Sequence, residues 1–114
     1  MLKTVVSAKL QNLTITDKKL YYSGSIQIDS RLLEKSGIIV GEKVQVVNLY
    51  NGQRFETYVI PGKPGSGIIG LRGPAARLGE IGDIITVIAY GMVDSTEGAR
   101  IKPKIINVKN GNKI

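Results

Sequence analysis

Two segments of the chain share one pattern, and this duplication constrains the fold more than any other feature. Residues 40–47 (VGEKVQVV) align with residues 81–88 (IGDIITVI) at an offset of 41 residues. Before each segment the sequence predicts a short helix that ends at a glycine, and before each helix an apolar strand that begins near Ser25 or Gly67. Two similar strand–helix–strand units predict a barrel with an internal pseudo-twofold axis. Gly-Glu or Gly-Asp before a strand is also common turn chemistry, so the recurring helix and glycine are what favour a true repeat.

Short β-branched segments between turn residues make up much of the remaining sequence, which predicts a mainly β fold. In residues 25–29 (SIQID) and 43–49 (KVQVVNL) apolar residues alternate, as in strands with one buried face. Residues 84–91 (IITVIAYG) are almost continuously apolar, which is typical of a strand buried on both faces. Residues 54–60 (RFETYVI) follow an Asn51-Gly52 step that suits a hairpin turn.

Two short helices are expected to interrupt the strands. Ser30 can cap the first helix, RLLEKS, and Gly37 suits the left-handed conformation at its end. Pro74 suits the first position of the second helix, and Gly79 its end.

The chain contains neither cysteine nor histidine. Disulfides and thiolate chemistry are therefore excluded, which fits a reducing compartment. Without histidine the chain lacks the usual general base and the usual metal ligand, so we expect neither a zinc site nor a Ser-His-Asp triad. No apolar run reaches the ~18 residues of a membrane span, and the N-terminus lacks the apolar core of a signal peptide. We expect a soluble cytoplasmic protein that does not bind membranes.

The net charge of +7 is concentrated at the C-terminus. Residues 100–114 contain five lysines and arginines and no acid, so residues 1–99 carry only +2. A basic end is usually solvated, and residues 109–114 are expected to form a mobile tail. The chain has one phenylalanine and no tryptophan for base stacking. We therefore do not expect it to bind nucleic acid.

The Gly24-Ser25 step raises a chemical possibility besides a turn, although a second Gly-Ser step at 65–66 shows how common the dipeptide is. The Ser25 hydroxyl could attack the Gly24 carbonyl, which no Cβ shields. The amide would become an ester, β-elimination would leave a dehydroalanine, and hydrolysis would leave a pyruvoyl group. This ketone could form Schiff bases with amines and act as an electron sink. A chain without histidine or cysteine could make an electrophile in this way.

Three segments carry a resemblance to a known family: residues 8–29 (AKLQNLTITDKKLYYSGSIQID), 51–83 (NGQRFETYVIPGKPGSGIIGLRGPAARLGEIGD) and 88–91 (IAYG). They resemble the pyruvoyl-dependent aspartate 1-decarboxylases, and the resemblance extends from Leu2 to about Val108. The family's spacing is kept without gaps at Lys9, Tyr22-x-Gly24-Ser25, Asn51-Gly52-x-Arg54, Thr57-Tyr58, Gly65-Ser66-Gly67, Gly73-x-Ala75-Ala76 and Gly82-Asp83.

The resemblance implies a double-psi β-barrel that forms a homotetramer in the cytoplasm and makes β-alanine for pantothenate biosynthesis. It implies one domain over residues 1–114, a zymogen that cleaves itself between residues 24 and 25 into fragments 1–24 and 25–114. The cofactor would be the pyruvoyl group made from Ser25, with no metal and no pyridoxal phosphate. The substrate would be a small acidic amino acid.

The resemblance also implies a role for individual residues. Ser25 becomes the pyruvoyl group that forms the Schiff base, and Gly24 becomes the new C-terminus. Thr57 polarises the Gly24 carbonyl during cleavage, and Tyr58 donates a proton to the carbanion left after CO2 departs. On simple alternation Thr57 points to the opposite face from Tyr58, so the strand must twist or bulge, or the site must lie between subunits.

The substrate-binding residues implied by the family are Lys9, Arg54, Gly73 and Ala75. Lys9 and Arg54 would hold the carboxylates of aspartate, and the guanidinium of Arg54 suits bidentate binding. Both could equally be solvated surface residues.

The chain departs from the family at three places. Gln11 and Tyr21 stand where histidines are common, and the motif Asn-Gly-Ala-Ala-Ala is replaced by RGPAA, residues 72–76. Arg72 is longer than asparagine, always charged and donor-only, so it is a further candidate for binding substrate and could also crowd the pocket or impair cleavage. Three functions follow: an aspartate decarboxylase, a divergent pyruvoyl decarboxylase for another acidic amino acid, or an unprocessed barrel acting as a binding module.

Overall fold

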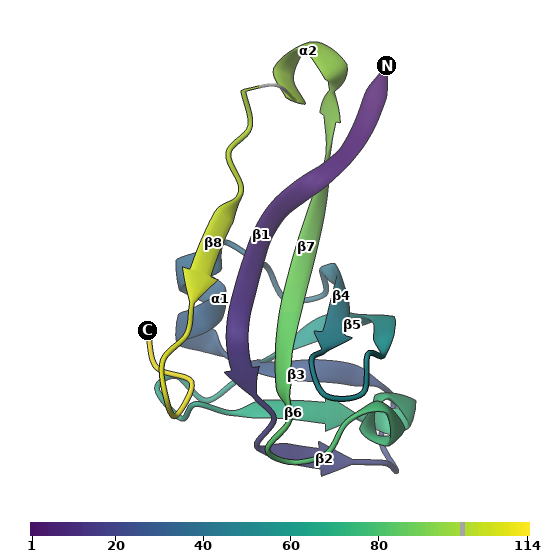
Figure 1. Ribbon diagram of the computed structural model, residues 1–114, viewed down its shortest axis with the longest axis vertical. Coiled ribbons are helices and arrows are strands. Elements are labelled where there is room, and N and C mark those ends of the chain that lie inside the picture. The colour runs from purple at the N-terminus through teal and green to yellow at the C-terminus, as the bar shows by residue number, and fades with distance from the viewer. Residues whose placement is uncertain (99) are drawn as a thin grey trace.

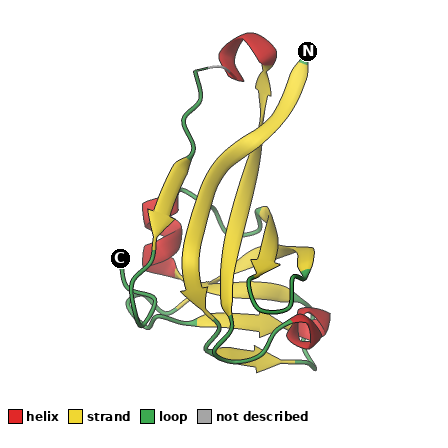
Figure 2. Cartoon of the chain, in the orientation of Figure 1, coloured by secondary structure: helices red, strands yellow, loops and turns green. Residues whose placement is uncertain are grey.

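The structure is a computed structural model that describes residues 1–98 and 100–114. The elements in these residues are β1 (Leu2–Thr14), β2 (Asp17–Lys19), β3 (Ser25–Asp29), α1 (Ser30–Ser36), β4 (Lys43–Asn48), β5 (Arg54–Gly62), β6 (Ile69–Arg72), the 3-10 helix η1 (Gly73–Leu78), β7 (Ile84–Asp94), α2 (Ser95–Gly98) and β8 (Lys104–Asn107). The short helices lie at the periphery of the strands (Figure 2). None of the helices in this part of the chain has the length and apolar character that a membrane crossing requires.

The strands form one mixed sheet in the order β2-β6-β3-β5-β4-β7-β1-β8. Strands from the two halves of the chain alternate in this order, because β3 pairs with both β5 and β6 while β4 pairs with both β5 and β7. β1 and β7 run antiparallel from Leu2↔Asp94 to Thr14↔Ile84 and project beyond the other strands as a long ribbon (Figure 1).

The predicted repeat is visible in the strand pairing. β4 and β7, which contain the two similar segments, are antiparallel neighbours, and β3 and β6 are as well. Val46 pairs directly with Val87, the residue 41 positions later that the sequence alignment equates with it. A twofold axis between the halves requires this arrangement. The core inside consists of aliphatic residues from both halves, including Leu10, Ile26, Ile28, Val44, Val46, Val59, Ile69, Leu71, Ile85 and Val87.

The predicted strands are present with the expected faces. Ile26 and Ile28 of β3 and Val44 and Val46 of β4 are buried. In β7 the predicted burial on both faces holds for Val87 to Ala89. The β4–β5 hairpin turns at Asn51-Gly52, with Gly52 at φ 72°. The sequence patterns gave no bounds for β1, β2 or β8.

Helix α1 begins differently from the prediction. Asp29, not Ser30, is the N-cap and accepts a hydrogen bond from the Arg31 amide, while the Ser30 hydroxyl donates to the Gly62 carbonyl. Ser30 is already inside the helix, so its side chain is free to tie the helix to β5. Gly37 ends the helix at φ 80°, as predicted.

The second predicted helix is the 3-10 helix η1, with proline in its first turn as predicted. Gly79 follows it as predicted, but in an extended conformation with φ −164°. Close packing favours glycine there instead, because a Cβ would lie 2.7 Å from Ile15 Cδ1 and 3.0 Å from Leu71 Cδ1, and these side chains would have to shift.

The C-terminal residues, for which the sequence suggested a mobile tail, are folded back onto the barrel. The amide of Thr14 donates to Asn112 Oδ1 (2.8 Å), and Asn112 Nδ2 donates to the carbonyls of Thr14 (2.9 Å) and Gly67 (2.7 Å). Lys109 and Lys113 pair across the turn. Asn112 is therefore a buried anchor that joins the end of β1 to the loop before β6.

Candidate active site

The backbone is strained at Gly24 and Ser25. Gly24 has φ 115° and Ser25 has φ 112°, a region that side-chain-bearing residues rarely adopt. Such strain persists only where the surroundings enforce it, and it concentrates at functional sites. Ser25 is 1% exposed. Its Oγ is buried without a hydrogen-bond partner among the described residues. A buried hydroxyl normally has a partner, so this one is available for another interaction.

Gly73 packs directly against this peptide. A Cβ at Gly73 would lie 2.8 Å from both Cα and N of Gly24 and 2.9 Å from the Tyr22 carbonyl oxygen, and its φ of 69° independently favours glycine. The backbone after β6 thus supports the Gly24–Ser25 peptide directly. Ala75, in the same 3-10 helix, is buried.

Thr57 and Tyr58 are on β5, the parallel neighbour of the strand that begins at Ser25. β3 and β5 are parallel and pair from Ile26↔Val59 onward. Carried one and two residues back, this register aligns Ser25 with Tyr58 and Gly24 with Thr57. Thr57 and Tyr58 do point to opposite faces, since Thr57 is half-buried next to buried Val59 while Tyr58 is 41% exposed. Both precede Val59, whose partner Ile26 directly follows the strained peptide.

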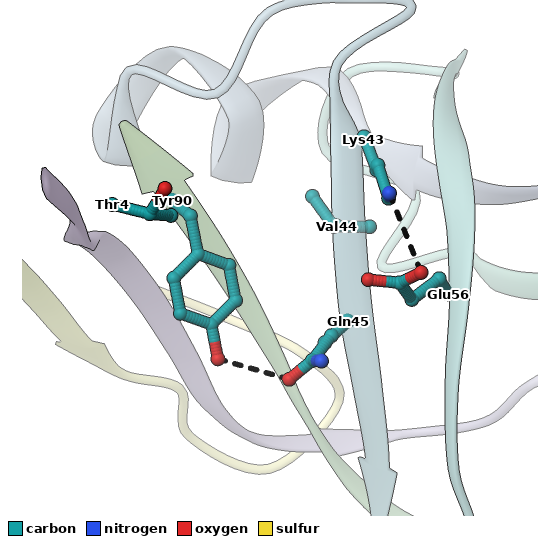
Figure 3. Close-up of a pocket in the computed structure, with 6 residues that line it drawn as sticks. All are labelled: Thr4, Lys43, Val44, Gln45, Glu56 and Tyr90. Carbon is teal, nitrogen blue, oxygen red and sulfur yellow. Dashed lines mark hydrogen bonds and ion pairs between the residues drawn. The ribbon is translucent and has the colours of Figure 1, made fainter. Parts of the chain in front are cut away.

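Lys9 and Arg54 lie on the outer face of the sheet. Lys9 pairs with Ile88, which pairs with Gln45, which pairs with Glu56, so these four form a row across β1, β7, β4 and β5. The Arg54 guanidinium donates to Gln45 Oε1 (2.9 Å), and so does the Tyr90 hydroxyl (2.9 Å). Figure 3 shows Tyr90 and Gln45 meeting in this way at the edge of an outer-face pocket of about 410 Å³.

Lys9 and Ser25 lie on strands that are not neighbours. β1 and β3 are four positions apart in the strand order. Gly24, Ser25 and Gly73 form one local group, and Thr57 and Tyr58 are on β5, which pairs with β3 just after Ser25. Lys9 is on β1, and Arg54 lies on the same strand face as Tyr58.

The Arg72 side chain lies on the sheet face of Ser25 and is held by two other residues. Its backbone pairs with Ser25, but its Nη2 donates to Gln27 Oε1 (2.6 Å) and forms an ion pair with Asp17 Oδ2 (3.0 Å). Its side chain is 6% exposed. Arg72 thus has two partners within the chain, and its contact with substrate stays a prediction.

The remaining departures lie outside the local group. Gln11 is half-buried on β1 beside Asn107 of β8, and Tyr21 is 96% exposed. No cluster of three acidic side chains that could hold a metal ion occurs in residues 1–98 and 100–114.

Comparison with known proteins shows the family of this chain. The family model described as aspartate decarboxylase matches residues 1–114. The chain belongs to the aspartate decarboxylase family.

Relatives of this family member are similar over nearly their whole length. A protein of Francisella tularensis subsp. holarctica (strain OSU18) named aspartate 1-decarboxylase is 52% identical over 98% of this chain and 100% of its own. Proteins of the same name from Carboxydothermus hydrogenoformans and Coxiella burnetii are 50% and 48% identical, covering 100% and 96% of this chain and 90% and 97% of their own.

A solved structure identifies the architecture. The computationally designed msDPBB_sym2 protein, a double-psi β-barrel, superposes with a TM-score of 0.50 at 15% sequence identity. The match covers 76% of this chain and 99% of the design. This family member is therefore a double-psi β-barrel, as the resemblance implied.

The sequence analysis did not identify the polar residues that bind Arg54, Arg72 and Tyr90. Gln45 accepts hydrogen bonds from Arg54 and from Tyr90. Arg72 donates a hydrogen bond to Gln27 and forms an ion pair with Asp17. A glutamine on the outward face of an otherwise apolar strand, as in KVQVV and SIQID, was the available signal.

Proposed function

We propose that this chain is a self-processing, pyruvoyl-dependent aspartate 1-decarboxylase, a carbon–carbon lyase that converts L-aspartate to β-alanine and CO2 for pantothenate biosynthesis. Relatives with that name, 50–52% identical over almost the whole chain, support the reaction. Within the chain, the observation that carries the proposal is the buried, unpartnered hydroxyl of Ser25 in a strained peptide.

In the proposed cleavage, a bond forms between Ser25 Oγ and the Gly24 carbonyl carbon while the bond from that carbon to the Ser25 nitrogen breaks. Thr57, which the strand register aligns with Gly24, would donate a hydrogen bond to the carbonyl oxygen and stabilise its developing charge. Removal of the Cα proton of residue 25 then expels the Gly24 carboxylate. Water finally replaces the amine of residue 25, which leaves as ammonia, and the fragments are 1–24 and 25–114.

The residues present fit a pyruvoyl precursor. The Ser25 hydroxyl is not tied up by another hydrogen bond among the described residues, and Gly73 leaves no side chain that would separate the supporting backbone from Gly24. Once formed, the pyruvoyl group supplies a ketone that binds the substrate amine and accepts the electrons released with CO2.

The chain's own side chains would bind and protonate. Lys9 and Arg54 would pair with the two carboxylates of aspartate, and Arg54 is already oriented by Gln45. Tyr58, aligned with residue 25, would deliver its hydroxyl proton to the substrate carbon that loses CO2. The backbone of Gly73 and the small Ala75 would leave room beside residue 25 for the substrate.

A homotetramer in the cytoplasm completes the proposal. Lys9 is on β1, which is not a neighbour of the strand that carries Ser25, and a tetramer could bring the Lys9 of a neighbouring subunit to the site. Exposed apolar side chains on the long ribbon and the adjacent edge strand, such as Leu2, Met92 and Ile105, offer surface for such an assembly.

Intact-mass spectrometry of the purified protein tests the proposal. The expected result is two fragments that meet at residues 24 and 25, with the larger fragment lighter by one ammonia than a serine N-terminus would make it. Ser25→Ala should abolish cleavage and leave a folded oligomer. Ser66→Ala, the matched control, should cleave normally, since the Ser66 hydroxyl donates to the Lys63 carbonyl in a turn.

Two outcomes would contradict the proposal. A wild-type chain that stays intact would favour an unprocessed barrel that acts as a binding module. Cleavage at 24/25 followed by turnover of another acidic amino acid, with no turnover of aspartate, would favour a divergent pyruvoyl decarboxylase.

A further inference from the structure

A polar cluster with a buried arginine lies directly beside the strained peptide, because Arg72 pairs with Ser25. Arg72 Nη2 donates to Gln27 Oε1 at 2.6 Å and pairs with Asp17 Oδ2 at 3.0 Å. Gln27 Nε2 in turn donates to the Pro61 carbonyl at 3.2 Å. These contacts form a continuous polar chain across β2, β6, β3 and β5, which we call the Asp17–Arg72–Gln27 clamp.

The clamp shares its sheet face with Ser25. β3 and β6 are antiparallel, and Ser25 pairs with Arg72 while Gln27 pairs with Gly70. Residues that pair directly lie on the same face, and so do residues two apart on one strand. The strand that carries Ser25 is therefore held on both sides, by Arg72 toward β6 and through Gln27 toward β5.

The guanidinium lies close against the backbone of Gly70. A Cβ at Gly70 would be only 2.6–2.8 Å from Cζ and both terminal nitrogens of Arg72, so glycine there is needed for the clamp. Arg72 Nη1 is buried and has no partner among the described residues. A buried arginine that uses one nitrogen for two partners has little freedom to swing toward a substrate.

We infer that Arg72 is a positioning residue for self-cleavage and not a substrate-binding cation. The inference rests on the proposed function. The positive φ of Ser25 is unfavourable and must be enforced by the strands around it. The clamp fixes β3 against β6 and β2 next to that residue, and so holds the Ser25 hydroxyl near the Gly24 carbonyl. Where the family has a short asparagine, this chain would keep the geometry by a longer link through Asp17.

The rate of cleavage in fresh chain is the direct measurement. Precursor made by cell-free synthesis is followed by intact mass, and the first-order rate is fitted for wild type, Asp17→Asn, Gln27→Leu and Arg72→Gln. Asp17→Asn is the mildest change, because the Asp17 side chain is 42% exposed and the variant keeps its shape. We expect each variant to slow cleavage at least fivefold. Asp17→Asn combined with Arg72→Gln should slow it less than the product of the single effects, because the residues act as one unit.

A matched control distinguishes loss of the clamp from a general weakening of the contacts of β2. Lys18 of β2 forms an ion pair with Glu80 at 2.8 Å, and Lys18 pairs with Leu71 and not with Arg72. Glu80→Gln should cleave at the wild-type rate. Unfolding of every variant is measured in the Ser25→Ala background, so that a lower cleavage rate is compared among proteins that are folded at the assay temperature.

Different failures point to different errors. A wild-type chain that never cleaves at 24/25 refutes the proposed function and this inference with it. If wild type cleaves and the folded clamp variants cleave equally fast, only the inference is refuted. If Arg72→Gln cleaves normally but has a higher Michaelis constant for aspartate, Arg72 binds substrate and the inference is refuted.

Discussion

Replacing Gly73 by alanine tests whether the backbone beside the cleavage site must be free of a side chain. The added Cβ would lie 2.8 Å from Gly24 Cα and N and 2.9 Å from the Tyr22 carbonyl oxygen. Ordinary contacts of this kind begin near 3.4 Å. Either Gly73 or the Gly24–Ser25 peptide must therefore shift by about half an ångström, and neither is a flexible side chain that can turn aside.

The expected destabilisation has two parts. Gly73 has φ 69°, where an alanine costs roughly 1–2 kcal/mol. The close contact adds the cost of overpacking, typically about 1–3 kcal/mol. The second part also acts on function, because a displaced Gly24 carbonyl is no longer aligned for attack by the Ser25 hydroxyl. We expect cleavage of Gly73→Ala to be at least tenfold slower than that of the wild type.

Gly52→Ala is the matched control. Gly52 has φ 72°, and a Cβ added there would have no atom within 4 Å, so the variant meets the same backbone cost without the contact. Thermal unfolding of both variants in the Ser25→Ala background should show an additional loss of about 4–12 °C for Gly73→Ala, at roughly 4 °C per kcal/mol. Equal melting temperatures together with wild-type cleavage of Gly73→Ala would refute the close packing of Gly73 against Gly24.

Two further predictions concern the loop before β6. Asn112→Ala should lower the free energy of unfolding by roughly 1–3 kcal/mol, because it leaves three backbone partners without their hydrogen bonds. Urea unfolding compares this variant with Asn110→Ala at an exposed site. Equal stabilities of the two variants would contradict the prediction. Burial raises the pKa of the Asp29 carboxyl, but hydrogen bonds from the amides of Arg31, Gly67 and Gly65 outweigh this and hold the pKa below its ordinary value of 3.8. The stabilisation by ionised Asp29 is therefore present above that pH and is lost as the pH falls through the lower native pKa. Between pH 6 and pH 3, Asp29→Asn should lose less stability than the parent protein, as measured by urea unfolding at both pH values. An equal loss would show that Asp29 is not the titrating group.

Local patterns in the sequence determined much of this protein. Alternation in SIQID and KVQVV, the Asn51-Gly52 step and the duplicated segments each reflect a preference of neighbouring residues, so they predicted strands, a hairpin and a repeated barrel. The Gly24-Ser25 step suggested self-cleavage as an alternative to a turn, because that chemistry needs only adjacent residues, and it stays a prediction.

Only the tertiary structure decided where the longer side chains and the chain ends lie. Asn112 anchors to Thr14 across 98 residues of sequence, and Arg72 meets Gln27 across 45. The direction of Arg72 depends on Asp17, Gln27 and the space above Gly70, which belong to three different strands. No periodicity in one segment encodes such a meeting, because it arises from the register between strands. The same register pairs Ile26 with Val59, the residues that directly follow the strained peptide and Tyr58.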